Sequence, residues 1–325
     1  MLKRLPLALS IVALSGMAMA DPLPSWNEGT SKSRLVDFVE LVTDPDSDDY
    51  VTPEDRIAVF DNDGTLWAEQ PMYFQVMFAL DAVQAMARQD PSILTSDTLR
   101  AAAEGDLAKV LEGGQEALLE IVEVTHSGMS VDTFIAEVQL WLETATHPDT
   151  GLDFDQMTYQ PMVELLRYLR DEGFETYIVS GGGIHVIRSF SQEAYGIPPE
   201  NVIGTLTKSE YQMIDGVPMV MKTPGIAFIN DKAGKPVGID RHIGKRPILA
   251  GGNSDGDFEM LEWTTAGDGP RLGMIVHHTD GVREYAYDRD SHIGKLARGL
   301  DEGPGMGWLI VDMAQDWSRI YTGQP

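Results

Sequence analysis

Residues 56–65 read RIAVFDNDGT, and this stretch decides the fold. Its first five residues form a short β-branched and aromatic run, which is typical of a buried strand in a parallel sheet. Two carboxylates follow at once, Asp61 and Asp63, and a turn begun by Gly64 can aim both into one small site. Taken alone, the pair also fits an ordinary aspartate-rich turn. The ends of the other strands therefore decide whether this edge of the sheet is an active site.

Short apolar strands alternate with helical stretches along the rest of the chain. The residue pattern predicts a helix at 162–170, a β-hairpin at 208–221 and strands at 176–179, 247–250, 272–276 and 308–311. The segment 72–142 is rich in Ala, Leu, Met, Glu and Gln at helical spacing and has almost no strand signal. This order predicts an α/β protein with a doubly wound, mainly parallel, Rossmann-like sheet and a helical interruption.

Composition excludes several classes of site. The 325 residues include 24 Lys and Arg, 51 Asp and Glu and no cysteine, for a formal net charge of −27. The absence of cysteine excludes disulfides, thiolate metal sites and a cysteine nucleophile, and the acidity argues against nucleic acid as a partner. Any phosphate site must be a local exception, built from a cation, a lysine or aimed backbone amides.

The first 20 residues are typical of a secretory signal peptide. Lys3 and Arg4 precede an apolar run at 5–17, and Ala18 and Ala20 supply the small residues of a cleavage site. We therefore expect cleavage after Ala20 and a periplasmic or secreted protein. No later segment reaches the length of a membrane span, so no membrane association is expected after cleavage.

Three further strand ends carry residues suited to binding an anion or a cation. Ser180 leads three glycines whose backbone N–H groups can approach an anion closely. Lys235 lies at an expected helix start and can place a positive charge on a phosphoryl oxygen. The loop at 251–257, GGNSDGD, offers closely spaced oxygen ligands of the kind that Mg²⁺ prefers.

This ordered set resembles the haloacid dehalogenase superfamily, in its phosphoserine-phosphatase-like branch. The first motif of the family, Asp-x-Asp-Gly-Thr, matches residues 61–65; the second matches Ser180, the third Lys235, and the acidic fourth loop residues 252–257. After the expected signal peptide at 1–20, the resemblance implies an α/β core at 21–71 and 155–325, with a helical cap inserted at 72–154.

The resemblance also implies a Mg²⁺-dependent phosphomonoesterase that acts on a small phosphorylated metabolite. Asp61 would be the nucleophile that forms an aspartyl-phosphate, and Asp63 the general acid and base. Phosphate or substrate would be bound by Ser180, Gly181, Lys235, Thr65 and Glu69, and Glu69 would suit an ammonium group on the substrate. The Mg²⁺ ligands would be Asp61, Asp63, Asn253 and Asp257.

Some points stay open at this stage. The family usually has an aspartate where this chain has Asn253, so the ion would bind more weakly or depend on Asp257 and Asp255. Lys232 and Lys245 compete with Lys235 for the third motif, and the Gly-Lys-Pro context favours Lys235. Phosphotransfer through the same intermediate and a catalytically weak binding protein are the alternative functions, and the sequence indicates neither the substrate nor the oligomeric state.

Overall fold

The computed structural model describes residues 21–323. The predicted signal peptide at 1–20 lies outside these residues, so cleavage and export stay predictions. In the described part of the chain, none of the helices combines the length and the apolar character needed to cross a membrane.

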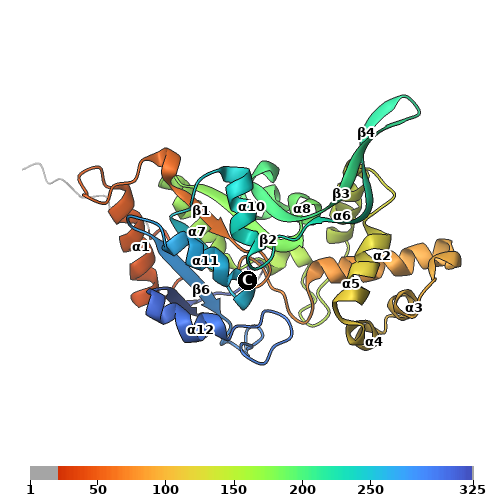
Figure 1. The fold of residues 1–325 in the computed structure, drawn as a ribbon. Coiled ribbons are helices and arrows are strands. Elements are labelled where there is room, and N and C mark those ends of the chain that lie inside the picture. Colours follow the sequence, from red (N-terminus) through yellow and green to blue (C-terminus); the bar gives the residue numbers. More distant parts are fainter. Residues whose placement is uncertain (1–20, 324–325) are drawn as a thin grey trace, which may run out of the picture.

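A seven-stranded sheet forms the centre of the molecule, in the order β4-β3-β2-β1-β5-β6-β7. All neighbouring strands are parallel except β3 and β4, which are antiparallel. This topology confirms the predicted doubly wound α/β class (Figure 1). The strands are β1 (Ile57–Phe60), β2 (Glu175–Gly183), β3 (Val202–Ile214), β4 (Val217–Phe228), β5 (Leu249–Gly252), β6 (Leu272–His277) and β7 (Leu309–Asp312).

Strand β1 is buried on both of its faces, which explains its continuous apolar run. Ala58 and Phe60 pack into one core cluster with residues of α1 (Thr30–Thr43) and α7 (Gln160–Asp171). Ile57 and Val59 pack into a second cluster with α10 (Gly234–Ile243) and α11 (Phe258–Thr265). Because side chains alternate along a strand, helices on both faces leave only the strand ends open for chemistry.

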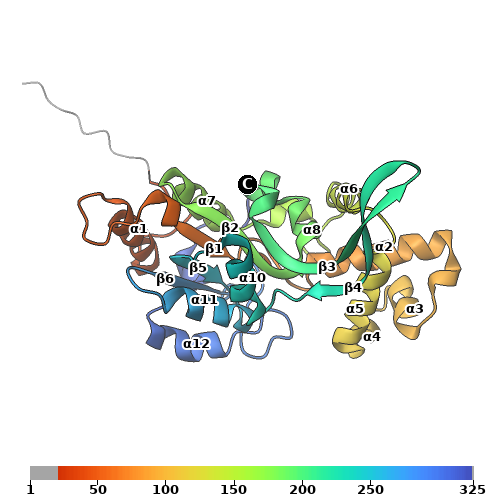
Figure 2. The ribbon, with the colours of Figure 1, turned by 45° about the horizontal axis from the view of Figure 1, so that its top comes forward.

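Besides α7, five α-helices lie between β1 and β2 in the sequence, and the first four of them share a small core of their own. Ala79, Val83, Leu99 and Ile121 are among its buried residues. Figures 1 and 2 show these helices together at one end of the molecule, beyond the sheet. They are α2 (Phe74–Gln89), α3 (Asp97–Glu104), α4 (Leu107–Glu112), α5 (Gly114–Thr125) and α6 (Val131–Leu142). The domain limits at 72–154 stay a prediction.

The hairpin of β3 and β4 is longer than the predicted 208–221 and reaches the helical insertion (Figure 2). Its turn lies where the Asp-Gly pair predicts it, since Asp215 and Gly216 have φ of 50° and 80°. The amide of Lys222 in β4 donates to the carbonyl of Met129 between α5 and α6 at 2.8 Å. The hairpin therefore belongs to the core sheet at one end and contacts the inserted helices at the other.

One local prediction is wrong. Residues 180–183 were expected as a loop after a strand ending at 179, but β2 continues through Gly183 before α8 begins at Ile184. The pairing of β2 with β3 shifts between Val179 and Gly183, so the strand is irregular over these residues. The remaining helices are α8 (Ile184–Arg188), α9 (Ser191–Tyr195), α12 (Arg298–Glu302) and α13 (Met313–Asp316).

Candidate active site

The carboxyl ends of the central strands and the helical insertion enclose a cavity of about 350 Å³. Asp61, Asp63, Ser180 and Lys235, predicted from four separate motif positions, contribute to its lining. The core side also supplies Glu69, Gly181, Gly182, Asp231 and Ser254, and α2 and its start supply Tyr73, Gln75 and Val76. The sheet topology thus brings together residues that lie up to 193 positions apart, from Asp61 to Ser254.

Lys235 is the buried cation of this site. Its Nζ lies 2.8 Å from Asp61 Oδ1 and 2.6 Å from Asp257 Oδ1, and it donates to the carbonyl of Val179 at 2.9 Å. Burial alone would lower the pKa of Lys235. The attraction of the two carboxylates, of which Asp257 has the larger effect, outweighs burial and raises this pKa. The lysine is therefore charged at any physiological pH and holds Asp61 in place.

The carboxylates around Lys235 exceed it in number. Burial, with repulsion from Asp257, raises the pKa of Asp61 to about 8. Burial likewise raises the pKa of Asp63 and, more strongly, that of Glu69. One lysine does not neutralise all of these carboxylates. The charges of the site therefore favour the binding of a further cation.

Ser180 and the glycines after it present polar groups to the cavity. The Ser180 hydroxyl is buried and accepts a hydrogen bond from the amide of Gly182 at 3.0 Å. Gln75, in the first turn of α2, accepts from the amide of Gly183 at 2.7 Å, and its Nε2 contacts His126 Nε2 at 3.3 Å. Gln75 thus connects the inserted helices to the glycine segment, a contact that the sequence did not predict.

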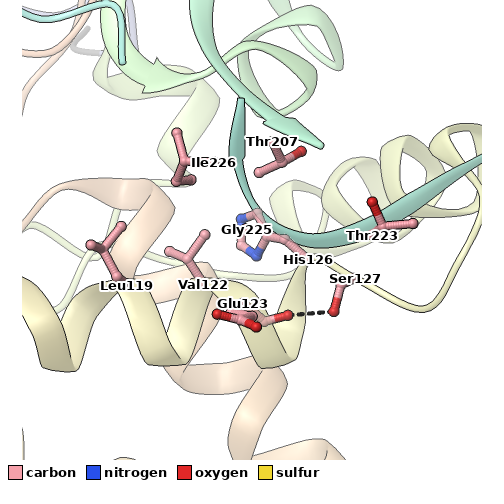
Figure 3. Close-up of a pocket in the computed structure, with 9 residues that line it drawn as sticks. All are labelled: Leu119, Val122, Glu123, His126, Ser127, Thr207, Thr223, Gly225 and Ile226. Carbon is pink, nitrogen blue, oxygen red and sulfur yellow. Dashed lines mark hydrogen bonds between the residues drawn. The ribbon is translucent and has the colours of Figure 1, made fainter. Parts of the chain in front are cut away.

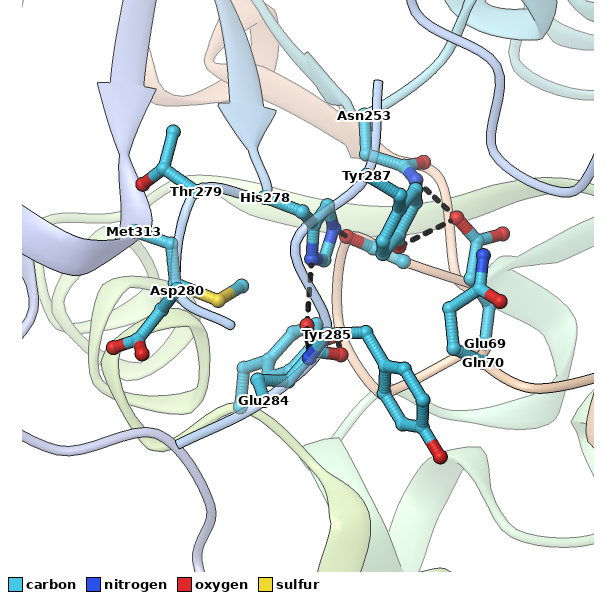
Figure 4. A network of polar contacts seen from close by, with 12 residues as sticks. Glu69, Gln70, Asn253, His278, Thr279, Asp280, Glu284, Tyr285, Tyr287 and Met313 are labelled. Carbon is cyan, nitrogen blue, oxygen red and sulfur yellow. Dashed lines mark hydrogen bonds and ion pairs between the residues drawn. The ribbon is translucent and has the colours of Figure 1, made fainter. Parts of the chain in front are cut away.

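Asn253 and Glu69 form a buried pair next to the loop at residues 61–65 (Figure 4). Asn253 Nδ2 donates to Glu69 Oε1 at 2.7 Å, and Tyr287 OH donates to the same oxygen at 2.7 Å. Thr65 Oγ1 donates to Asn253 Oδ1 at 3.2 Å, so Thr65 orients the amide instead of lining the cavity. Gly64 has φ of 73°, and a Cβ there would lie 2.0 Å from Asn253 Nδ2, so only glycine fits.

A segment after β6 supports the loop at residues 61–65, and no sequence pattern predicted this contact. His278 Nε2 donates to the carbonyl of Gly64 at 2.8 Å, and its Nδ1 lies 3.3 Å from Glu284 Oε2 (Figure 4). The ring of His278 also stacks on Tyr287, with centroids 4.3 Å apart. This segment therefore positions both the turn at Gly64 and, through Tyr287, the carboxylate of Glu69.

Hydrogen bonds and ion pairs distinguish the other candidate residues of the fourth loop and the third motif from one another. Asp257 uses Oδ1 for Lys235 and Oδ2 for the amides of Asn253 and Ser254, at 3.0 and 3.1 Å. Asp255, the alternative ligand, instead accepts from the amides of Ala297 and Gly299 at the start of α12. Of the competing lysines, Lys245 pairs with Asp55 on the surface and Lys232 is exposed, which leaves Lys235 for the site.

Comparison with known proteins identifies the family. The model of the haloacid dehalogenase-like hydrolases matches residues 58–262, more than half of the chain. The chain belongs to this family. No curated protein sequence matches it.

Two solved structures illustrate how this haloacid dehalogenase-like chain compares with known folds. A functionally unknown protein from Anaerococcus prevotii DSM 20548 is 17% identical with a TM-score of 0.53, and the match covers 81% of this chain and 89% of that one. A phosphoserine phosphohydrolase-like protein from Francisella tularensis subsp. tularensis SCHU S4 is 18% identical with a TM-score of 0.41, covering 77% and 99%. At this identity, the first match supports the fold alone.

The residues of this family member fit the Mg²⁺ that the resemblance implies. Within residues 21–323, no three Asp, Glu, His or Cys side chains are arranged to hold a metal ion by themselves. Mg²⁺, however, usually keeps several waters and takes only one or two carboxylates together with substrate phosphate. The buried carboxylate of Asp61, the half-buried carboxylate of Asp63 and the buried amide oxygen of Asn253 are hard oxygen donors of that kind.

Proposed function

We propose that this chain is a Mg²⁺-dependent phosphomonoesterase acting on a small phosphorylated substrate. The observation that carries the proposal is the lining of one cavity by Asp61, Asp63, Ser180 and Lys235. These four provide a nucleophile, an acid or base, a hydroxyl and a cation. Phosphoryl transfer needs these groups around one phosphorus atom.

Asp61 is the nucleophile in this proposal. Its carboxylate attacks phosphorus in line and displaces the alcohol oxygen, so a P–O bond to Asp61 forms as the ester P–O bond breaks. Lys235, 2.8 Å from Oδ1, fixes the carboxylate and favours its charged, nucleophilic form. Water then attacks the aspartyl-phosphate and releases inorganic phosphate.

Asp63 supplies the proton to the departing alkoxide and later removes one from the attacking water. Burial raises the pKa of Asp63, so it holds a proton at higher pH than an exposed aspartate does. Trp67 Nε1 donates to Asp63 Oδ1 at 2.8 Å and fixes the direction of this side chain. In this proposal Ser180 and the amide of Gly181, which line the cavity, bind the remaining phosphoryl oxygens.

Mg²⁺, when bound, would neutralise charge on the phosphoryl oxygens and on the nucleophile. Asp61, Asp63 and Asn253 are the residues that we propose hold it. Asp257 was also predicted as a ligand, but both of its oxygens are engaged by Lys235 and loop amides, which favours a positioning role. Glu69, predicted to bind substrate, lines the cavity but is engaged by Tyr287 and Asn253.

The test is phosphate release from p-nitrophenyl phosphate by the chain without residues 1–20. We expect activity with Mg²⁺, loss with EDTA, and loss of at least a thousandfold in Asp61→Asn. Asp37→Asn, an exposed aspartate on α1, is the matched control and should retain full activity. Activity that survives both chelation and Asp61→Asn would contradict the proposal, and added alcohol would reveal phosphotransfer as a second product.

We also propose that the enzyme works outside the cytoplasm, as the signal-like order of residues 1–20 indicates. Cell fractionation of the full-length chain tests this. A soluble extracytoplasmic product that begins at Asp21 supports it, and an uncleaved product that stays in the cytoplasm refutes it.

A further inference from the structure

The catalytic cavity has a polar floor and an apolar outer part. The floor is formed by the carboxylates, Ser180 and Lys235. The outer part is formed mainly by side chains of the inserted helices and the hairpin, namely Val76, Leu118, Leu119, Val122, Ile226 and Ile229. A phosphoryl group at Asp61 would therefore have its alcohol portion directed toward aliphatic side chains.

The apolar surface continues beyond this cavity. A neighbouring cavity of about 180 Å³ lies between α5 and the hairpin, and it shares Leu119, Val122 and Ile226 with the catalytic one (Figure 3). His126 also lines it, and burial lowers the pKa of this histidine to about 3, so its ring is neutral. Glu123, Ser127, Thr207 and Thr223 line this second cavity as well, so the aliphatic surface that continues away from Asp61 is the part formed by the three shared residues.

The charges of the cavity disfavour acidic alcohols. Among the described residues that line it, Lys235 is the one cation, and it is engaged by Asp61 and Asp257. Asp231 adds a further carboxylate to the lining. Its Oδ1 would lie 3.6 Å from a Cβ built on Gly181, so it lies beside the glycine segment. A carboxylate or second phosphate on the substrate would find no second cation among these lining residues and would meet the carboxylate of Asp231.

We propose that the substrates are phosphomonoesters of uncharged, largely apolar alcohols, such as alkyl or aryl phosphates, rather than phosphoamino acids or nucleotides. This inference rests on the proposed phosphatase activity. Leu118, Leu119 and Val122 of α5 and Ile226 of β4 set the specificity, because they contact the alcohol portion and not the phosphoryl group.

The experiment compares kcat/KM for ethyl, butyl and hexyl phosphate with that for phosphoserine and phosphoethanolamine. Each buried methylene contributes roughly a few-fold, so hexyl phosphate should exceed ethyl phosphate by at least about tenfold. Phosphoserine should fall below butyl phosphate by at least about tenfold. Equal values along the alkyl series, or a preference for phosphoserine or phosphoethanolamine, would overturn the inference while leaving the phosphatase proposal intact. No release from any ester would overturn both.

A substitution in α5 tests the surface itself. Leu119→Ser should reduce the hexyl-to-ethyl ratio several-fold, because Leu119 borders both cavities. Leu111→Ser is the matched control, since Leu111 is similarly exposed, at 44% against 39%, but lines neither cavity. Leu119→Lys gives a second readout and should raise the relative rate with phosphoserine. An unchanged ratio in both Leu119 variants would refute the assignment of this surface.

Discussion

Replacing Lys235 by methionine tests the electrostatic account of the site most directly. The side chain is almost wholly buried, and its Nζ lies 2.6 Å from Asp257 and 2.8 Å from Asp61, which are themselves buried. Removing one partner of a buried ion pair leaves an uncompensated charge and costs about 3–5 kcal/mol. We therefore expect Lys235→Met to lower the free energy of unfolding by about 3–5 kcal/mol at pH 8.

The loss should depend on pH in a defined direction. Burial already raises the pKa of Asp61 to about 8, and removal of the lysine raises it further. A carboxyl whose folded-state pKa is raised binds more protons when folded than when unfolded, so stability falls as pH rises. The variant should therefore be closer to the parent at pH 5.5 than at pH 8.

The assay is urea denaturation in EDTA, with two companion variants. Lys235→Met combined with Asp257→Asn removes one unpaired charge and should recover a large part of the loss, although neither variant should be active. Lys245→Met is the control, because its pair with Asp55 is about half exposed on both sides and contributes below about 1 kcal/mol. A loss under about 1 kcal/mol in Lys235→Met, or no recovery in the double variant, would refute the account.

Two further predictions concern Asn253, in the fourth loop, and His126, at the end of α5. Asn253→Asp places a carboxylate against Glu69, so its melting temperature in EDTA should fall, and Mg²⁺ or the second change Glu69→Gln should restore it; an unshifted melting temperature in EDTA would argue against the 2.7 Å contact. His126→Gln should remove an acid-sensitive component of stability, because burial lowers the folded-state pKa of His126 to about 3 and stability is lost as pH falls below about 6.5. Between pH 7.5 and 5 the parent should lose about 2 kcal/mol more than the variant in urea denaturation, and parallel losses would contradict this.

Local pattern was enough to predict the fold and the residues that strand ends carry. A few adjacent apolar residues predict the strand before Asp61, and the glycines after Ser180 predict a place where an anion can approach the backbone. Parallel strands bring such strand ends to one edge of the sheet. The supporting contacts have no local signature. His278 reaches the carbonyl of Gly64 across 214 positions, and Asn253 reaches Glu69 across 184. Single contacts of this kind show no period and no fixed spacing, so only the folded chain reveals them.

The contact between Asn253 and Glu69 gives a physical reason for the main departure from the family pattern. An aspartate at 253 would bring two carboxylates within 2.7 Å in a site where burial already raises the pKa of Asp61, Asp63 and Glu69. With an amide there, Glu69 receives a hydrogen bond from Asn253 and a second from Tyr287. Glu69, which lines the same cavity, is thus held by two hydrogen-bond donors, whereas an aspartate at 253 would face it with a second carboxyl group. On this reasoning, substituting Asn253 alone perturbs the site more than substituting Asn253 and Glu69 together.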